Sequence, residues 1–464
     1  MIRTISATII IRLDVSIISV RFLAGGLQCI IYVRTEKYPV IIIIQDVQSA
    51  IYYFIEICIY GKIKRWHEYR KGHQGMLHLL KRNHAQSGRN GQNQEEEKKV
   101  EYIELIYDLI FVYLIGRNNS LLTHIQYGFI SGRVFLTYVL VTLTIIQIWS
   151  FTTFYINRHG RKSLREHVFL FVNMYLLYYM ADGTRVYWQS HFDRYNTAWA
   201  LILFNIGLQY FLESRSYTVT PWNLAQIRRN CFIIWGEMLI VIISIPAWHL
   251  RGLILSPAAI AFGMFAMLLS GKVNRLVPVD FPHLSERAML YVVFTFGEMI
   301  IAIAGYFEEE ISLNAVYFSA MAFLIVVGLF LSYGTIYDHI LDRNLNTTGI
   351  SYMLLHIFLI FSLNNITTAL EFMREETISL LPKTLFITGS ILLYFLFLFL
   401  TGIFAKKRMR PGRRFIMRHA VLAGAFVMLM IVFREKMVVN IAVTVVYVFA
   451  NYLMLHLYGR KLRA

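Results

Sequence analysis

The fold class is decided by a stretch of 23 residues without a charged side chain, VFLTYVLVTLTIIQIWSFTTFYI at positions 134–156. A helix needs about 20 predominantly apolar residues to cross the roughly 30 Å hydrocarbon core of a bilayer. The sequence therefore predicts an all-α, polytopic transmembrane bundle of about 12 helices within residues 100–464. We expect the apolar segments at 103–116, 134–156, 167–181, 197–212, 231–245, 252–270, 288–305, 314–333, 350–370, 384–404, 419–433 and 437–457.

The composition excludes a soluble globular protein. Of the 464 residues, 57% are hydrophobic and 16% are charged, whereas soluble domains contain about 45–50% apolar residues. The three cysteines, Cys29, Cys58 and Cys231, are too few and too far apart for a disulfide framework or a thiolate metal site. We therefore expect neither a metal nor another cofactor, and the lipid bilayer is the first partner that the sequence implies.

The distribution of Lys and Arg predicts the orientation in the membrane, because cytoplasmic loops carry the excess of these residues. Loops on one side of the predicted bundle hold 21 of the 45 Lys and Arg residues, and loops on the other side hold 9. A further 10 lie in residues 61–99, which fall on the more basic side. We expect a multi-pass protein of the plasma membrane with both termini in the cytoplasm.

One loop concentrates the positive charge. Between positions 406 and 418 it contains seven basic residues, Lys406, Lys407, Arg408, Arg410, Arg413, Arg414 and Arg418. Such a cluster can bind nucleic acid or anionic lipid, but the orientation rule already explains it. We favour orientation, expect no nucleic-acid partner, and keep anionic lipid at Lys406–Arg418 as the alternative role.

The first 99 residues are patterned less clearly than the rest. Charged residues interrupt the apolar stretches 6–33 and 38–60, so neither resembles a clean span or a signal peptide. Residues 61–99 are basic and then rich in Gln, Asn and Gly, which is typical of a solvated linker. Two interpretations remain: a pair of membrane-associated helices, or a start codon assigned upstream of a chain that begins near Met76. We favour the second.

Four acidic residues lie inside the apolar segments, which contain no Lys or Arg by these boundaries. Glu104 and Asp108 are four residues apart, so both project from one helical face. Glu237 and Glu298 each stand in a Gly-Glu-Met sequence. A buried carboxylate is costly unless it faces a bundle interior or a wet cavity. We interpret Glu298 and Glu237 as central sites for a proton or a small cation, with Glu104 and Asp108 in a cytoplasmic vestibule.

Structural roles compete with this interpretation. A helix that starts at residue 288 places Glu298 on the order of 15 Å from its beginning, near the middle of the bilayer. Each glutamate could still be a protonated packing contact, with the preceding glycine allowing close helix approach. Asp338 and His356 are candidate proton-relay groups, although a core histidine with satisfied hydrogen bonds is an equal alternative for His356.

Motifs for other chemistry are weak. The sequence contains no phosphate-binding glycine loop, no Gly-x-Ser-x-Gly and no His-Glu-x-x-His. We therefore expect no enzyme of these common kinds and no ATP-driven pump. A membrane enzyme that acts on lipid stays as a third hypothesis, because His283, Glu286, Asp338 and His339 fall on one side of the predicted topology.

The acidic segments resemble those of a known family, the bacterial low temperature requirement protein A family, over about residues 100–460. Glu104-Leu-Ile-Tyr-Asp108-Leu-Ile-Phe-Val112 is similar to its first membrane segment. His283-Leu-Ser-Glu286-Arg287 followed by Gly297-Glu298 resembles its His-Leu-x-Glu-Arg stretch leading into Leu-Gly-Glu, except that Phe296 stands in place of the leucine. The resemblance implies a multi-helix membrane protein linked by name to growth in the cold.

These patterns favour a secondary transporter or a channel for protons or small cations. In this hypothesis Glu298 and Glu237 bind the ion, and Glu104 and Asp108 lie on its path. The alternative is a membrane sensor or scaffold for cold or envelope adaptation, in which the buried acids serve packing alone.

The start of the chain can be tested directly. If translation begins near Met76, mass spectrometry of the purified protein will find no tryptic peptide from residues 13–60. Peptides from 101–117 serve as the internal control, because both interpretations include them. Detection of peptides from 13–60 at comparable abundance would contradict the late start.

Overall fold

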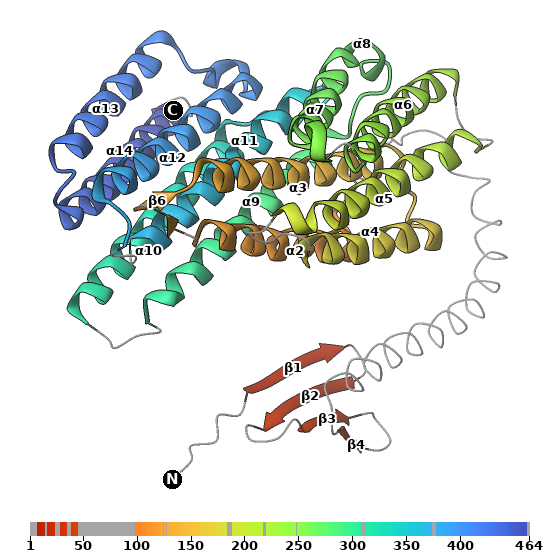
Figure 1. Ribbon diagram of the computed structural model, residues 1–464, viewed down its shortest axis with the longest axis horizontal. Coiled ribbons are helices and arrows are strands. Elements are labelled where there is room, and N and C mark those ends of the chain that lie inside the picture. Colours follow the sequence, from red (N-terminus) through yellow and green to blue (C-terminus); the bar gives the residue numbers. More distant parts are fainter. Residues whose placement is uncertain are drawn as a thin grey trace, which may run out of the picture. The chain divides into compact units, whose positions relative to one another are not determined.

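The computed structural model describes four strands within residues 7–44 and most of residues 98–461 (Figure 1). The second range has gaps at 124, 127, 183–187, 217–219, 247, 308–311 and 374–376. The chain divides into two compact units, Met1–Glu95 and Glu96–Ala464. The predicted linker at 61–99 and the proposed start at Met76 lie outside the described residues, except for the last two positions of the linker.

The described residues of the first unit form an antiparallel sheet. Its strands are β1 (Ala7–Leu13), β2 (Ser16–Leu23), β3 (Gln28–Arg34) and β4 (Pro39–Ile44), paired in sequence order. The pairing aligns Ile10 with Ser19 and Ile31 with Ile42. The four described strands differ from the alternative of membrane-associated helices. Runs of isoleucine and valine favour strands, because β-branched side chains fit a pleated surface.

The second unit is all-α apart from one short hairpin. Among its described residues, twelve α-helices have 18 residues or more: α2 (Tyr102–Asn119), α3 (Gly132–His159), α4 (Leu164–Asp182), α5 (Trp188–Ser214), α6 (Pro221–Ser244), α7 (Trp248–Leu269), α9 (Phe281–Ala304), α10 (Leu313–Thr335), α11 (Ile350–Phe372), α12 (Leu380–Leu400), α13 (Arg413–Val432) and α14 (Met437–Lys461).

Short elements connect these helices. α8 (Gly271–Asn274) follows α7, and a hairpin of β5 (Ile125–Gln126) and β6 (Phe129–Ile130) precedes α3. A π-helical turn, η3 (Ile336–Ile340), extends α10. The 3₁₀ turns are η1 (Ser120–Thr123), η2 (Gly305–Phe307), η4 (Thr401–Phe404) and η5 (Lys407–Met409).

Seven helices in the described part of the chain are long and apolar enough to cross a membrane: α3, α9, α10 with η3, α11, α12 with η4, α13 and α14. Their burial differs strongly, since 78% of the most apolar window is buried in α11 and 67% in α3, but only 17% in α13. α3 and α11 therefore form the interior, and α13 lies at the periphery (Figure 1). The chain is a multi-pass helical membrane protein.

The start of α9 differs from the predicted segment at 288–305. Asp280 caps the helix, because its Oδ1 accepts a hydrogen bond from the backbone N–H of His283 at 3.1 Å. Pro282 in the first turn costs no hydrogen bond there. The helix thus begins at Phe281, which makes Arg287 part of the helix rather than of a loop. Glu298 then lies on the order of 25 Å from the helix start, toward its far end and not at its middle.

Glycines allow close packing at some helix contacts and not at others. A Cβ atom on Gly207 of α5 would lie 2.1 Å from Nε1 of Trp235 on α6, so the indole occupies the space that the glycine leaves. Gly236 also lies close to a ring, since its Cβ would be 2.9 Å from Phe262. Gly297 has no neighbour within 4 Å of such an atom. Close helix approach therefore accounts for the glycine before Glu237 but not for the one before Glu298.

The contact between α5 and α6 gives a test of the packing. Gly207→Ala should lower the free energy of unfolding by about 1–3 kcal/mol, because the added methyl group displaces the Trp235 ring. Thermal unfolding in detergent, followed by tryptophan fluorescence, measures the loss. Gly389→Ala on α12 is the control, since nothing lies within 4 Å of the added atom and alanine favours helix. Equal melting temperatures for the two variants would contradict the packing.

Candidate functional site

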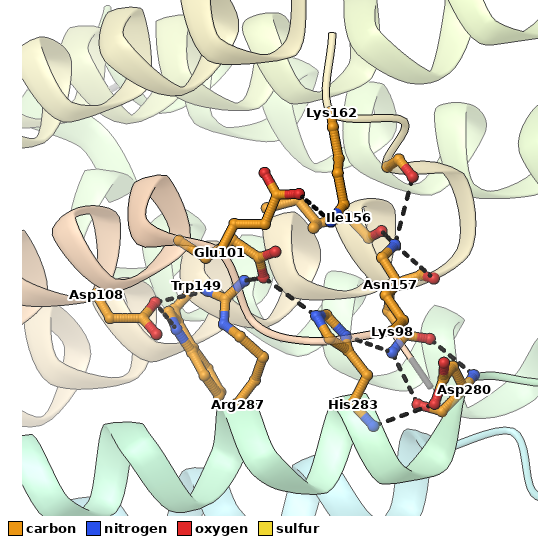
Figure 2. A network of polar contacts seen from close by, with 12 residues as sticks. Lys98, Glu101, Asp108, Trp149, Ile156, Asn157, Lys162, Asp280, His283 and Arg287 are labelled. Atoms are coloured by element: carbon orange, nitrogen blue, oxygen red, sulfur yellow. Dashed lines mark hydrogen bonds and ion pairs between the residues drawn. The ribbon is translucent and has the colours of Figure 1, made fainter. Parts of the chain in front are cut away.

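A cluster of charged side chains is buried between α2 and α9. Arg287 of α9 is fully buried and donates hydrogen bonds to two carboxylates of α2, Glu104 and Asp108. Its Nη2 lies 2.6 Å from Oδ1 of Asp108, and its Nη1 contacts Oε2 of Glu104. We call Glu104, Asp108, His283 and Arg287 the ion cluster; Figure 2 shows its neighbourhood.

The helical spacing on both sides explains why the cluster forms. Glu104 and Asp108 are one turn apart on α2, and His283 and Arg287 are one turn apart on α9, so each helix presents two groups on one face. Arg287 contacts Asp108, and Glu298, later in α9, lies beside Gly116, later in α2, so residue numbers rise in the same direction along both helices. α2 and α9 therefore run parallel at this interface, which brings two acids opposite two basic groups.

A third helix, α3, also contacts the ion cluster. Trp149 donates a hydrogen bond from Nε1 to Oδ1 of Asp108 at 2.9 Å. One turn further along α3, the hydroxyl of Thr152 lies 3.0 Å from that of Tyr107. The indole ring of Trp149 also packs on Tyr291 of α9, with ring centroids 4.5 Å apart. The carboxylate of Asp108 is therefore held by side chains from two other helices.

Asn157 near the end of α3 determines which nitrogen of His283 carries the proton. Its Nδ2 donates to the carbonyl of Asp280 at 2.8 Å, and its Oδ1 accepts from the N–H of Asp280 at 3.0 Å. This fixes the amide orientation, so Nδ1 of His283 accepts from Nδ2 of Asn157 at 3.0 Å. The neutral imidazole then carries its proton on Nε2, 3.4 Å from Oε2 of Glu104.

The ion cluster has one negative charge more than its permanent cation compensates. Two carboxylates face one guanidinium, and a neutral His283 adds no charge. Oδ2 of Asp108 is buried and has no hydrogen-bond partner among the described residues. A buried uncompensated charge is costly, so one additional proton, on His283 or on a carboxylate, stabilises the cluster.

A small pocket leads from the protein surface to Glu104. It has a volume of about 20 Å³ and is lined by Lys98, Glu101, Gly160 and Gln209 among others. Lys98 donates to the carbonyls of Ile156 at 2.5 Å and of Asn157 at 3.2 Å, at the end of α3 (Figure 2). Burial lowers the pKa of Lys98, while the charge of Glu104 acts against this shift. A space of about the size of one water molecule, lined by Lys98, therefore borders the ion cluster at Glu104.

The four predicted carboxylates lie in three different places. Only Glu104 and Asp108 come together. Glu237 on α6 accepts a hydrogen bond from Nε2 of Gln147 at 3.0 Å, and its carboxylate occupies the space beside Gly263 of α7. Glu298 is half-buried beside Gly116 of α2. Glu298 and Glu237, which we predicted as central sites for a proton or a small cation, face different helix neighbours, so they do not share one site.

The predicted relay groups are also separate. Asp338 is exposed and lies 3.4 Å from Arg343. His356 is buried, donates from Nδ1 to the carbonyl of Tyr352 at 2.9 Å, and lies 3.2 Å from the hydroxyl of Tyr333 through Nε2. Both ring nitrogens therefore have partners, as expected for a core histidine. His283 contacts Glu104 instead of Asp338, so the structure does not assemble the four-residue interfacial cluster of the lipid-enzyme hypothesis.

The sequence prediction missed Arg287 and the role of His283. Segment boundaries placed Arg287 in a loop, which gave the incorrect conclusion that the buried acids have no cation. The spacing His283–Arg287 was visible in the sequence, and it equals the spacing Glu104–Asp108. Extending the helix back to the Asp280 cap would have found the pair, because a capping aspartate followed by proline is a helix-start signal.

Removal of the buried cation tests the ion cluster. Arg287→Gln should lower the free energy of unfolding by about 3–5 kcal/mol, because it leaves two buried carboxylates without a counter-charge. Arg343→Gln removes the exposed partner of Asp338 and should change it by about 1 kcal/mol or less. Thermal or denaturant unfolding in one detergent compares the two variants.

A second substitution separates charge from packing. Adding Glu104→Gln and Asp108→Asn to Arg287→Gln removes all three charges, so it should recover part of the lost stability. A triple variant that is less stable than Arg287→Gln alone would contradict the buried charge imbalance.

Comparison with known proteins adds one match. A family model described as bacterial low temperature requirement A protein (LtrA) matches residues 99–451. A comparison with curated proteins found no match. The matched range contains every residue of the ion cluster, as well as Glu237 and Glu298.

Proposed function

The chain belongs to the bacterial low temperature requirement A protein family, and on that premise we propose that it is a secondary transporter or channel for protons or small cations. The ion cluster is the proposed binding site. The observation that carries the proposal is the charge balance of Glu104, Asp108 and Arg287, which leaves one negative charge fully buried. A proton or a small cation is the ligand that neutralises it.

His283 is the proposed group that takes up a proton behind Glu104. Glu104 lines the pocket beside Lys98, and Nε2 of His283 faces the carboxylate of Glu104 at 3.4 Å, so a proton that enters through the pocket reaches the imidazole by way of Glu104. Protonation of His283 creates a second cation in the cluster and weakens the hold of Arg287 on Glu104. The same charge change gives a physical route from proton binding to a shift of α9 against α2.

Aromatic rings between Asp108 and Glu298 support a barrier to the movement of ions. Tyr107, Phe111 and Tyr291 are fully buried, with centroids 5.1 Å apart for the first pair and 6.0 Å for the second. Beyond these rings, Glu298 lies beside Gly116, eight residues and about 12 Å further along α2 than Asp108. We assign Glu298 to a second protonation site across this barrier, and alternating access would require the rings to move.

The orientation follows from the charge distribution. We propose that the membrane is the plasma membrane, that both termini are cytoplasmic, and that all twelve long helices cross or enter the bilayer. The ion cluster then lies near the cytoplasmic side. α3 runs antiparallel to α2, since Asp108 contacts Trp149 while Asn118 contacts Thr142, and this supports alternating helix directions at the start of the bundle.

One observation favours a second function. Arg287 contacts both carboxylates directly, and Glu237 has a hydrogen-bond partner, as in a rigid structural core. A membrane sensor or scaffold for cold or envelope adaptation would use the ion cluster only to hold α2, α3 and α9 together. Transport of ions distinguishes this role from the first.

Flux through reconstituted vesicles tests the proposed function. Proteoliposomes that contain a pH-sensitive dye should acidify under an inward proton gradient, and Asp108→Asn should reduce the rate about tenfold or more, because the unbalanced charge is gone. Glu298→Gln should also reduce it. Asp338→Asn is the matched control, since it makes the same kind of change on an exposed side chain.

Two results would contradict transport. The first is a wild-type protein that moves no H⁺, Na⁺ or K⁺ under any imposed gradient. The second is a proton flux that Asp108→Asn leaves unchanged. Each variant is first checked for the wild-type elution volume and helix content, so that loss of flux is not loss of fold.

A further inference from the structure

A groove between α12 and α13 lies apart from the ion cluster. It has a volume of about 600 Å³, which falls within the range of roughly 300–1,000 Å³ typical of small-molecule sites. Phe399 and Ile403 line one side, Phe415 and Ala420 line the other, and Arg410 lies at one end. The groove arises because α13 packs mainly against α14 and touches α12 less.

The walls of the groove continue into surface that faces the lipid. Ile403 is 65% exposed, Ile416 is 59% exposed and Val421 on the same helix is 73% exposed. Apolar side chains with this exposure on a membrane-spanning helix contact acyl chains. A ligand that enters the groove from the side therefore comes from the bilayer rather than from water.

The end of the groove is strongly basic. Arg410 lines it directly, and the remaining members of the same loop cluster are all exposed: Lys406, Lys407, Arg408, Arg413, Arg414 and Arg418. No carboxylate forms an ion pair with any of the seven within the described ranges. The hydroxyl of Tyr458 donates to the carbonyl of Arg410 at 2.9 Å and thereby fixes the loop to α14. Positive charge without an acidic partner at the lipid surface attracts anionic headgroups.

A histidine of α13 belongs to the lining of the groove. His419 is packed between Phe399 and Phe415, with ring centroids 4.4 and 4.2 Å away. Its Nδ1 donates to Oδ1 of Asn451 at 2.7 Å, because Nδ2 of Asn451 is used in donating to the carbonyl of Tyr447. Its Nε2 is buried and lacks a hydrogen-bond partner among the described residues. The walls of the groove are therefore mostly apolar, and its charged side chain is Arg410 at one end.

We propose that the groove binds one anionic phospholipid, with its phosphate at Arg410 and the neighbouring basic side chains and an acyl chain along Phe399 and Ala420. The loop cluster then has a binding role in addition to setting orientation. This proposal does not depend on ion transport, because it rests on a different part of the bundle.

Lipid retention in native mass spectrometry tests the proposal on the full chain. The protein is purified in detergent and given equal amounts of phosphatidylglycerol and phosphatidylcholine with the same acyl chains. The wild type should retain one phosphatidylglycerol molecule in preference to phosphatidylcholine. Arg410→Gln with Arg413→Gln should reduce that preference about tenfold, because each arginine contributes to headgroup attraction. Arg434→Gln, next to Glu435 beyond the other end of α13, should leave it unchanged.

A second pair of variants tests the groove itself. Ala420→Phe fills the space and should lower retention of phosphatidylglycerol about tenfold, whereas Val421→Phe, one residue further on α13 and outside the lining, should not. Both positions are exposed, so neither ring disturbs buried packing. High salt should weaken retention by the wild type, which checks the role of charge without any substitution.

Three results would overturn the proposal. Equal retention of the two lipids by the wild type removes the selectivity for negative charge. Equal retention by Ala420→Phe and Val421→Phe shows that lipid binds elsewhere. A wild-type dimer that Ala420→Phe converts to a monomer assigns the groove to a second copy of the chain instead of to lipid.

Discussion

The ion pairs of Arg287 with Glu104 and Asp108 are the constraint on which the arrangement of the central helices depends. In a bilayer the hydrophobic effect does not drive one apolar helix against another, because lipid is as apolar as leucine. Polar contacts and close packing must fix the register instead. A guanidinium with 0% exposed side-chain area that contacts two carboxylates leaves little freedom for α9 to slide along α2.

Neighbouring polar groups extend this constraint to α3. Trp149 of α3 donates a hydrogen bond to Asp108 of α2. Asn157, further along α3, bonds to Asp280 and His283 at the start of α9, so α3 is held at two points along its length. Asn118 adds a third level near the other end of α2, because its Nδ2 lies 2.6 Å from the hydroxyl of Thr142. The buried polar residues therefore form an ordered interface, which can serve a rigid scaffold or, when a proton changes the charge of the cluster, a switch between two helix positions.

The outer helices obey a different rule. α13 is mostly exposed to lipid and makes few polar contacts with its neighbours, so its position depends on packing against α14 and on the loop that precedes it. Here the basic residues stay outside the apolar zone, in contrast to Arg287. The chain thus uses positive charge inside to compensate buried acids, and we propose that it uses positive charge at the surface to set orientation and to attract lipid headgroups.

The sequence by itself determined the class of the protein. Apolar runs near residues 134–156 and further along the chain are long enough to require a membrane. The acidic motifs indicated the family of the chain, and the family model that matches residues 99–451 confirms it. It also identified Glu104 and Asp108 as neighbours on one helical face, since helical periodicity is local. The strands at residues 7–44 were not foreseen, although their β-branched residues are a local signal for strands.

Only the tertiary structure decided which acids share a site. The partners of Glu104 and Asp108 lie about 180 positions away at His283 and Arg287, and no local pattern specifies which helix faces which. Hydropathy started the predicted segment only at residue 288, after Arg287, because arginine is unfavourable in lipid, yet pairing with two carboxylates makes the same residue stable in the interior. The separation of Glu237 and Glu298 was likewise invisible in their shared Gly-Glu-Met sequence, because identical motifs on two helices carry no information about which way each helix is turned.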